Sequence, residues 1–141
     1  MISLWSANRA MANYECWAKS NHFKVKDIEG LRKSLERFSG LMLDHIIDNL
    51  YIILPDEDFN VYKYTDENYD FEDKRLDPQV DIIPYLEDDE IFITFEVGHE
   101  KQRYMCGYAQ AFCKDKEPIA ISTEDIYALA LKSFGIDVRY D

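Results

Sequence analysis

The sequence predicts an α+β fold, a single domain in which about three helices cover an antiparallel-rich sheet, close to a ferredoxin-like arrangement. Three observations lead to this prediction. Strand-like runs follow one another between the helical segments, without strict alternation of strand and helix. Three stretches have the apolar spacing or the cap residues of a helix. The 141 residues, 47% of them hydrophobic, are enough to bury one core.

The first elements are a strand and a helix. Residues 13–26 are rich in aromatic residues and carry apolar groups at both parities, as in a central strand or one with a bulge at Ser20-Asn21. Asp27 then caps a helix that ends at Gly40. The apolar stripe of this helix consists of Ile28, Leu31, Leu35 and Phe38.

A hairpin and a short helix are predicted next. Residues 41–54 are apolar and are interrupted at Asp48-Asn49, which suits a turn between two strands. Residues 59–64 predict a short strand, and residues 65–74 a loop. Asp77-Pro78 is a helix start, with the Asp at the cap and the Pro at the first position. We expect Val80 and Ile83 to face inward and Pro84 to end this helix.

The last part of the chain predicts three strands and a helix. Residues 91–98 alternate clearly, residues 103–113 run back, and residues 118–122 form the final strand. The middle strand has small residues on one face, Gly107, Ala109 and Ala111, against which a helix can pack closely. Ser122 to Asp125 resembles a capping box, and Gly135 closes the helix. Its wide apolar face consists of Ile126, Tyr127, Leu129, Ala130, Leu131 and Phe134.

Negative charge is concentrated in one segment, residues 55–90. It has fourteen acidic and three basic residues, a net charge of −11 out of −12 for the whole chain. We therefore divide the chain into an N-terminal extension, residues 1–12, and one domain, residues 13–141, with an acidic insert at 55–90. Aromatic residues recur through the insert, and aromatic anchors among carboxylates suit an interface with a basic protein. A solvated acidic loop that only aids solubility is the alternative.

The acidic segment supplies our candidate binding residues. Spaced carboxylates on a rigid surface can imitate the phosphates of a nucleic acid. The expected partner is a basic protein or nucleoprotein surface, and the sequence leaves the oligomeric state open. The candidate partner-binding residues are Asp56, Glu57, Asp58, Asp66, Glu67, Tyr69, Asp70, Glu72, Asp73, Glu87, Asp88 and Asp89.

Composition and motifs argue against several other classes. A pI of about 4.6 has the wrong sign for direct nucleic-acid or anionic-membrane binding. No apolar run approaches a membrane span, and the first residues do not read as a signal peptide, so we expect a cytosolic protein with reduced cysteines. The glycines form no phosphate-binding loop. We predict no enzyme activity, cofactor or metal.

Weaker chemical alternatives remain at four places. Cys106, Cys113 and a histidine could supply zinc ligands, although their spacing is not that of a metal site. Cys16 or Cys106 could form a nucleophile pair with a histidine, although the chain has no cysteine signature of a known enzyme family. Residues 66–73 carry acids but lack the glycine and terminal glutamate of a calcium loop. Residues 96–103 are a solvated hairpin tip or a contact loop.

Three stretches resemble a known group of proteins. They are MANYECWAKSNHFKVKD, FEVGHEKQRYMCGYAQA and ISTEDIYALALK, which cover the start at Met11 and most of the C-terminal half. They resemble small acidic, largely uncharacterised proteins of phages and mobile elements of gut-type bacteria. The motifs carry no chemical signature, so the resemblance assigns no catalytic residue. It implies a context, since such proteins are often anti-restriction or anti-CRISPR inhibitors of host defence.

The charge and the resemblance lead to one functional hypothesis and one alternative. The hypothesis is a non-enzymatic inhibitor of a host-defence nucleoprotein complex, whose acidic surface blocks a nucleic-acid-binding site. The alternative is a small protein that sequesters a nucleotide signal in an aromatic pocket near Arg103, Tyr104 and Tyr108.

Overall fold

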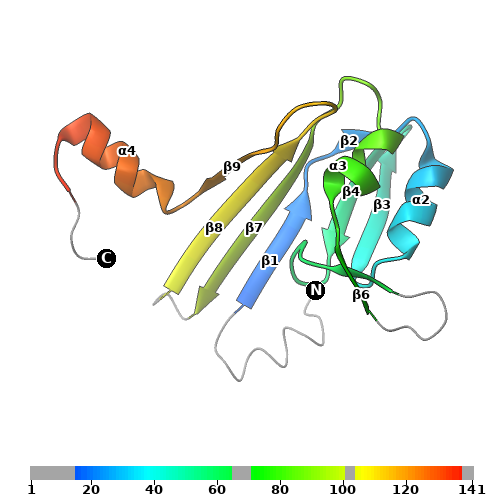
Figure 1. Ribbon diagram of the computed structural model, residues 1–141, viewed down its shortest axis with the longest axis horizontal. Helices are drawn as coiled ribbons and strands as arrows, with labels where there is room; N and C mark the ends of the chain where they lie inside the picture. The colour runs from blue at the N-terminus through cyan, green and yellow to red at the C-terminus, as the bar shows by residue number, and fades with distance from the viewer. Residues whose placement is uncertain (1–14, 65–70, 101–103, 138–141) are drawn as a thin grey trace.

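A computed structural model describes residues 15–64, 71–100 and 104–137. Strands predominate in these residues, with helices between and after them (Figure 1). In chain order the elements are β1 (Glu15–Ser20), β2 (Phe23–Lys24), α2 (Ile28–Glu36), β3 (Leu41–Ile47), β4 (Leu50–Pro55), β5 (Tyr62–Tyr64), β6 (Phe71–Arg75), α3 (Pro78–Asp81), the 3-10 helix η2 (Ile83–Tyr85), β7 (Phe92–Glu100), β8 (Tyr104–Phe112), β9 (Ile119–Ser122) and α4 (Asp125–Phe134).

The strands form three antiparallel sheets. Their strand orders are β1-β7-β8-β9, β2-β4-β3 and β5-β6. This confirms the predicted single α+β domain with antiparallel sheets. The ferredoxin-like arrangement is found only in part. β4 lies between β2 and β3 and pairs antiparallel with both, so β2, α2 and β3 form a split βαβ unit. The other described strands belong to two further sheets, so these residues do not form the single four-stranded sheet of that fold.

The predicted first strand is in fact two strands that belong to different sheets. Asn21 lies at the break, where its side chain accepts a hydrogen bond from the Ile93 amide (2.8 Å) and donates one to the Ile91 carbonyl (2.9 Å). The buried Ser20 hydroxyl accepts from the Ile53 amide of β4 (2.8 Å). Where the chain passes from one sheet to the other, the side chains of Ser20 and Asn21 therefore make hydrogen bonds to the backbone in place of strand-to-strand bonds. β1 and β4, which belong to different sheets, lie side by side at this point (Figure 1).

Helix α2 covers the core as predicted. Its apolar stripe is buried at Leu31 and Leu35, and the Asp27 carboxylate caps it by accepting from the Gly30 amide (3.0 Å). A Cβ at Gly30 would lie 2.7 Å from the Tyr85 ring, so glycine permits this close approach. The core consists of Phe23, Val25, Leu31, Leu35, Tyr51, Ile53, Ile82, Ile83, Leu86, Phe92 and Phe112.

The acidic segment is part of the folded domain rather than an appended loop. Its helices contribute Ile82, Ile83 and Leu86 to the core. The loop predicted at 65–74 is wrong in its second half, because β6 pairs there with β5 despite its charged sequence. Val80 is 62% exposed, not inward-facing, because α3 is a single turn and Ile82 takes the buried position.

The C-terminal strands match their prediction, but the last helix does not pack as expected. Gly135 closes α4 in the left-handed conformation (φ 72°). None of the described α4 side chains is buried, and Figure 1 shows α4 extending beyond the edge strand β9. The close packing predicted against Gly107, Ala109 and Ala111 is therefore not made within one chain.

Candidate partner-binding surface

The predicted acidic residues separate into two groups at opposite ends of β4. The first acidic group is Asp56, Glu57 and Asp58, directly after β4. The second acidic group is residues 87–90, which lies beside the start of β4, where the Asn49 side chain donates to Glu87. A strand of six residues separates them by roughly 17–20 Å. One continuous acidic patch across all the candidates is thus not formed.

The remaining candidates lie between these groups in the sequence. Asp66, Glu67, Tyr69 and Asp70 fall outside the described residues. Glu72 and Asp73 belong to β6, for which the structure gives the backbone pairing with β5.

Nearby lysines partly offset the charge of the second acidic group. Lys26 Nζ lies 3.0 Å from Asp88 Oδ1, and this hydrogen bond, together with the charges of Lys26 and Lys114, lowers the pKa of Asp88. Glu90 accepts a hydrogen bond from the Lys24 amide (2.6 Å). The adjoining hollow, about 800 Å³, is lined by Lys26, Lys114 and Lys116 as well as by acids. This end of the molecule is mixed in charge.

The first acidic group lies in a different electrostatic setting. It borders a hollow of about 270 Å³ whose lining, within the part of the chain that the structure describes, includes no lysine or arginine. Asp56 is exposed, and Asp58 is held in place by accepting the Asn60 amide (2.9 Å). The hollow therefore presents the exposed Asp56 carboxylate and the fixed Asp58 carboxylate to an incoming cation.

Glu96, which sequence reasoning placed in a solvated hairpin tip, joins the first acidic group. Its Oε2 accepts a hydrogen bond from the Phe59 amide (3.0 Å), although the two residues are 37 apart in sequence. Burial raises the pKa of Glu96, and the neighbouring Asp58 charge raises it further against the opposing effect of the Phe59 bond. The sequence contains one indication of this position. Glu96 and the buried Phe92 are four residues apart in a strand, so their side chains lie on the same face of the sheet.

This environment predicts a pH-dependent effect of Glu96→Gln. A carboxyl group whose pKa is raised by folding favours the folded state below its unfolded pKa, near 4.5, and loses that contribution as pH rises through the folded pKa. We expect the substitution to increase the free energy of unfolding at pH 7 by about 0.5–1 kcal/mol, because a half-exposed site is partly screened. Urea unfolding at pH 7 and at low pH measures this.

The gain should disappear at acid pH, where both side chains are neutral. Glu117→Gln makes the same change at an exposed position and is the control, with little expected effect at either pH. An equal gain from Glu96→Gln at both pH values would contradict this account of the site.

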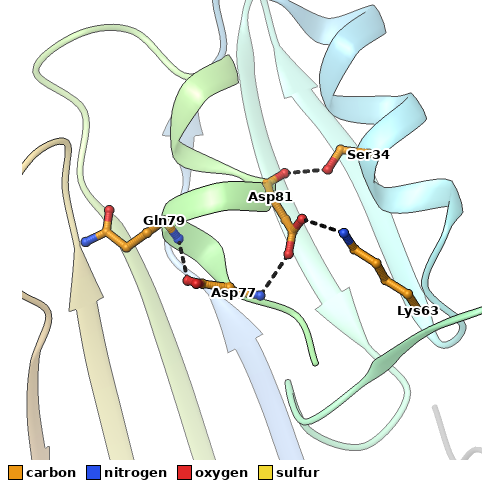
Figure 2. Close-up of polar contacts among 5 residues, drawn as sticks. All are labelled: Ser34, Lys63, Asp77, Gln79 and Asp81. Carbon is orange, nitrogen blue, oxygen red and sulfur yellow. Dashed lines mark hydrogen bonds and ion pairs between the residues drawn. The ribbon is translucent and has the colours of Figure 1, made fainter. Parts of the chain in front are cut away.

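A buried polar network anchors the acidic segment to the domain. Asp81 is 5% exposed, accepts from the Asp77 amide (2.8 Å) and lies 3.5 Å from Lys63 Nζ of β5. The Ser34 hydroxyl of α2 donates to the Asp81 carbonyl (2.7 Å), as Figure 2 shows. Asp81 is thus an internal acid that fixes three elements together.

The other chemical candidates gain little from the structure. Within residues 15–64, 71–100 and 104–137, no three histidine, cysteine or acidic residues are placed to hold a metal ion. Cys16, Cys106 and Cys113 are half-buried, and no disulfide joins these three cysteines. None of the described helices is long and apolar enough to cross a membrane.

The proposed ligand pocket is only partly described. Arg103 lies outside the described residues, and Tyr104 is known only as part of β8. Tyr108 borders a hollow of about 490 Å³ that Phe59, Arg75 and Glu96 also line.

Comparison of the chain with protein-family models, with curated proteins and with solved structures gives no match.

Proposed function

We propose that the protein is a non-enzymatic inhibitor that binds a basic protein surface through the first acidic group and Glu96. The partner we favour is a host-defence nucleoprotein complex in the cytoplasm, whose nucleic-acid-binding site would be blocked. The observation that carries the proposal is that Glu96 reaches the segment of the first acidic group through its hydrogen bond with the Phe59 amide. Beside that segment, Asp56 and Asp58 line a hollow with no lysine or arginine among its described lining residues, while Glu96 lines the adjoining 490 Å³ hollow.

The electrostatics of the surface favour a cationic ligand. Asp58 and Glu96 repel each other, and Glu96 is also partly desolvated. An arginine or lysine placed between them would relieve both penalties, and an arginine can bond two carboxylate oxygens at once. Sites that bind nucleic acid are rich in these residues, because they neutralise phosphates. The chain charge of −12 would also speed encounter with such a surface.

A second candidate function rests on the 490 Å³ hollow. Phe59 and Tyr108 offer stacking surfaces, and Arg75 offers a cation, which together suit a nucleotide. Arg75 already donates to the Asn60 side chain (3.1 Å), so phosphate binding would compete with that bond. A nucleotide-dependent rise in melting temperature would favour this function, and the main proposal expects none.

Affinity capture from a bacterial host lysate tests the main proposal. The tagged protein is incubated at about 50 and 500 mM salt, because screening weakens contacts between exposed charges. We expect one basic nucleoprotein to be retained at low salt only and to be released by added DNA or RNA. A partner retained equally at both salt concentrations, or unaffected by nucleic acid, would refute the acidic-surface mechanism.

A further inference from the structure

Helix α4 lacks the packing that a helix of its length needs. It has ten residues, and isolated helices shorter than about 12–15 residues are only marginally stable in water. Ile126 and Phe134 are 60% and 75% exposed, and the other large apolar side chains of the helix are also exposed. Its apolar face is therefore available to a surface outside this chain's own core.

The β1-β7-β8-β9 sheet has an open apolar face. Its register places Trp17 beside Val97, and Ala109 between Phe95 and Ile121. All of these except Ala109 are large apolar residues with 41–68% of their surface exposed. Small residues along β8 leave a shallow apolar hollow of about 260 Å³ between the larger side chains.

The connection to α4 directs the helix away from this face of its own chain. The Thr123 amide donates to the Gly107 carbonyl (2.9 Å), and the Thr123 hydroxyl accepts from the Gly107 amide (3.2 Å). The Asp125 carboxylate accepts from the Ser122 amide (2.7 Å). These bonds hold the two-residue link as a continuation of the sheet, so α4 leaves beyond β9 (Figure 1).

We propose that α4 of each copy packs over β8 of a second copy, forming a helix-swapped dimer. One chain carries both an unpacked amphipathic helix and an open groove of small residues, and a two-fold axis satisfies both at once. A standard specific interface buries about 1,600 Å². The two contacts would cover the exposed apolar side chains of both helices together with Trp17, Phe95, Val97 and Ile121 of both sheets. The first acidic group approaches Glu96 on the opposite face of the sheet and stays accessible.

Matched lysine substitutions on α4 test the dimer. Ile126 and Ala128 are both exposed and, two residues apart, lie on nearly opposite sides of the helix. Sedimentation velocity of the full chain at about 100 µM should give twice the 16.7 kDa of one chain. We expect Ile126→Lys to raise the dissociation constant about 100-fold, because it buries a charge at both contacts. Ala128→Lys should change it less than threefold or so.

A mixing experiment separates swapping between copies from other arrangements. Ala109→Lys blocks the groove, and on its own it should yield monomers, as Ile126→Lys does. Mixed together, the two variants should form a heterodimer, because the intact helix of one fits the intact groove of the other. A wild-type monomer, a dimer insensitive to both substitutions, or no heterodimer on mixing would each overturn the proposal. Loss of the dimer in a chain that starts at Met11 would also overturn the proposal, because it would show that the N-terminal extension, and not α4, makes the contact between copies.

Discussion

Neutralising Asp56 and Asp58 together, as Asp56→Asn with Asp58→Asn, is expected to weaken binding of the captured basic partner by about 30-fold or more, equal to ~2 kcal/mol. The matched variant, Asp88→Asn with Asp89→Asn, removes the same charge and should weaken binding by less than about threefold. The difference arises because Lys26 already pairs with Asp88, whereas the hollow at Asp56 and Asp58 has no lysine or arginine among its described lining residues.

The two variants have the same net charge, so the comparison removes long-range attraction as an explanation. Asparagine at position 58 can still accept the Asn60 amide, which preserves the local turn. Binding is measured by calorimetry at several salt concentrations, and the first variant should also show the smaller salt dependence. Equal losses in both variants would mean that total charge, and not this surface, determines binding.

A third arm addresses the rest of the acidic segment. Asp70→Asn, Glu72→Gln and Asp73→Asn are combined in one variant, on the β5-β6 hairpin and the residues before β6. If this variant alone abolishes binding, the partner-binding surface belongs to the hairpin, and the proposal for the first acidic group is wrong.

Elements fixed by neighbouring residues were predictable from the sequence. Asp27, Asp77-Pro78 and Gly135 act on the turns next to them, and each caps its helix as expected. The alternation in β7 likewise needs only local reading. By contrast, the passage between sheets at Ser20-Asn21 depends on hydrogen bonds to residues 33 and 72 positions away, which a local pattern does not contain.

The candidate site was predictable in composition but not in arrangement. Charge counting selected residues 55–90, yet β4 lies between the two ends of this segment, and lysines from other segments partly offset the charge of one end. Glu96 joins the first acidic group through β7, outside the segment altogether. Counting charge does not separate the buried Asp81 from the exposed acids of the segment, and pairing with Lys63 makes burial of that carboxylate tolerable.

The dimer and the acidic surface are compatible on one molecule. The first acidic group approaches Glu96, which shares a face of β7 with the buried Phe92, and the open apolar face of Phe95 and Val97 is the opposite one. A helix-swapped dimer would therefore carry two acidic surfaces. Against a partner with repeated basic sites, such bivalency strengthens binding without any new contact.

Asp81→Asn is expected to lower the free energy of unfolding by about 3 kcal/mol, because it leaves the Lys63 ammonium largely buried without its carboxylate. The asparagine still accepts the Asp77 amide, so the effect isolates the ion pair from the hydrogen bond. A loss of this size is a large share of the 5–15 kcal/mol that stabilises a typical domain. Asp89→Asn, the same change at an exposed position, is the control.

Removing the charge of Lys63 as well should restore part of that stability. Lys63 Nζ lies 5.8 Å from the centre of the Phe38 ring, so a methionine at position 63 can pack there without a charge. In the double variant Lys63→Met with Asp81→Asn, we expect at least about half of the 3 kcal/mol to return. Urea unfolding of the two single variants and the double variant at pH 7 gives the coupling energy. Losses that simply add would show that Asp81 acts only as an acceptor for Asp77, and that β5 is held to α3 by apolar packing.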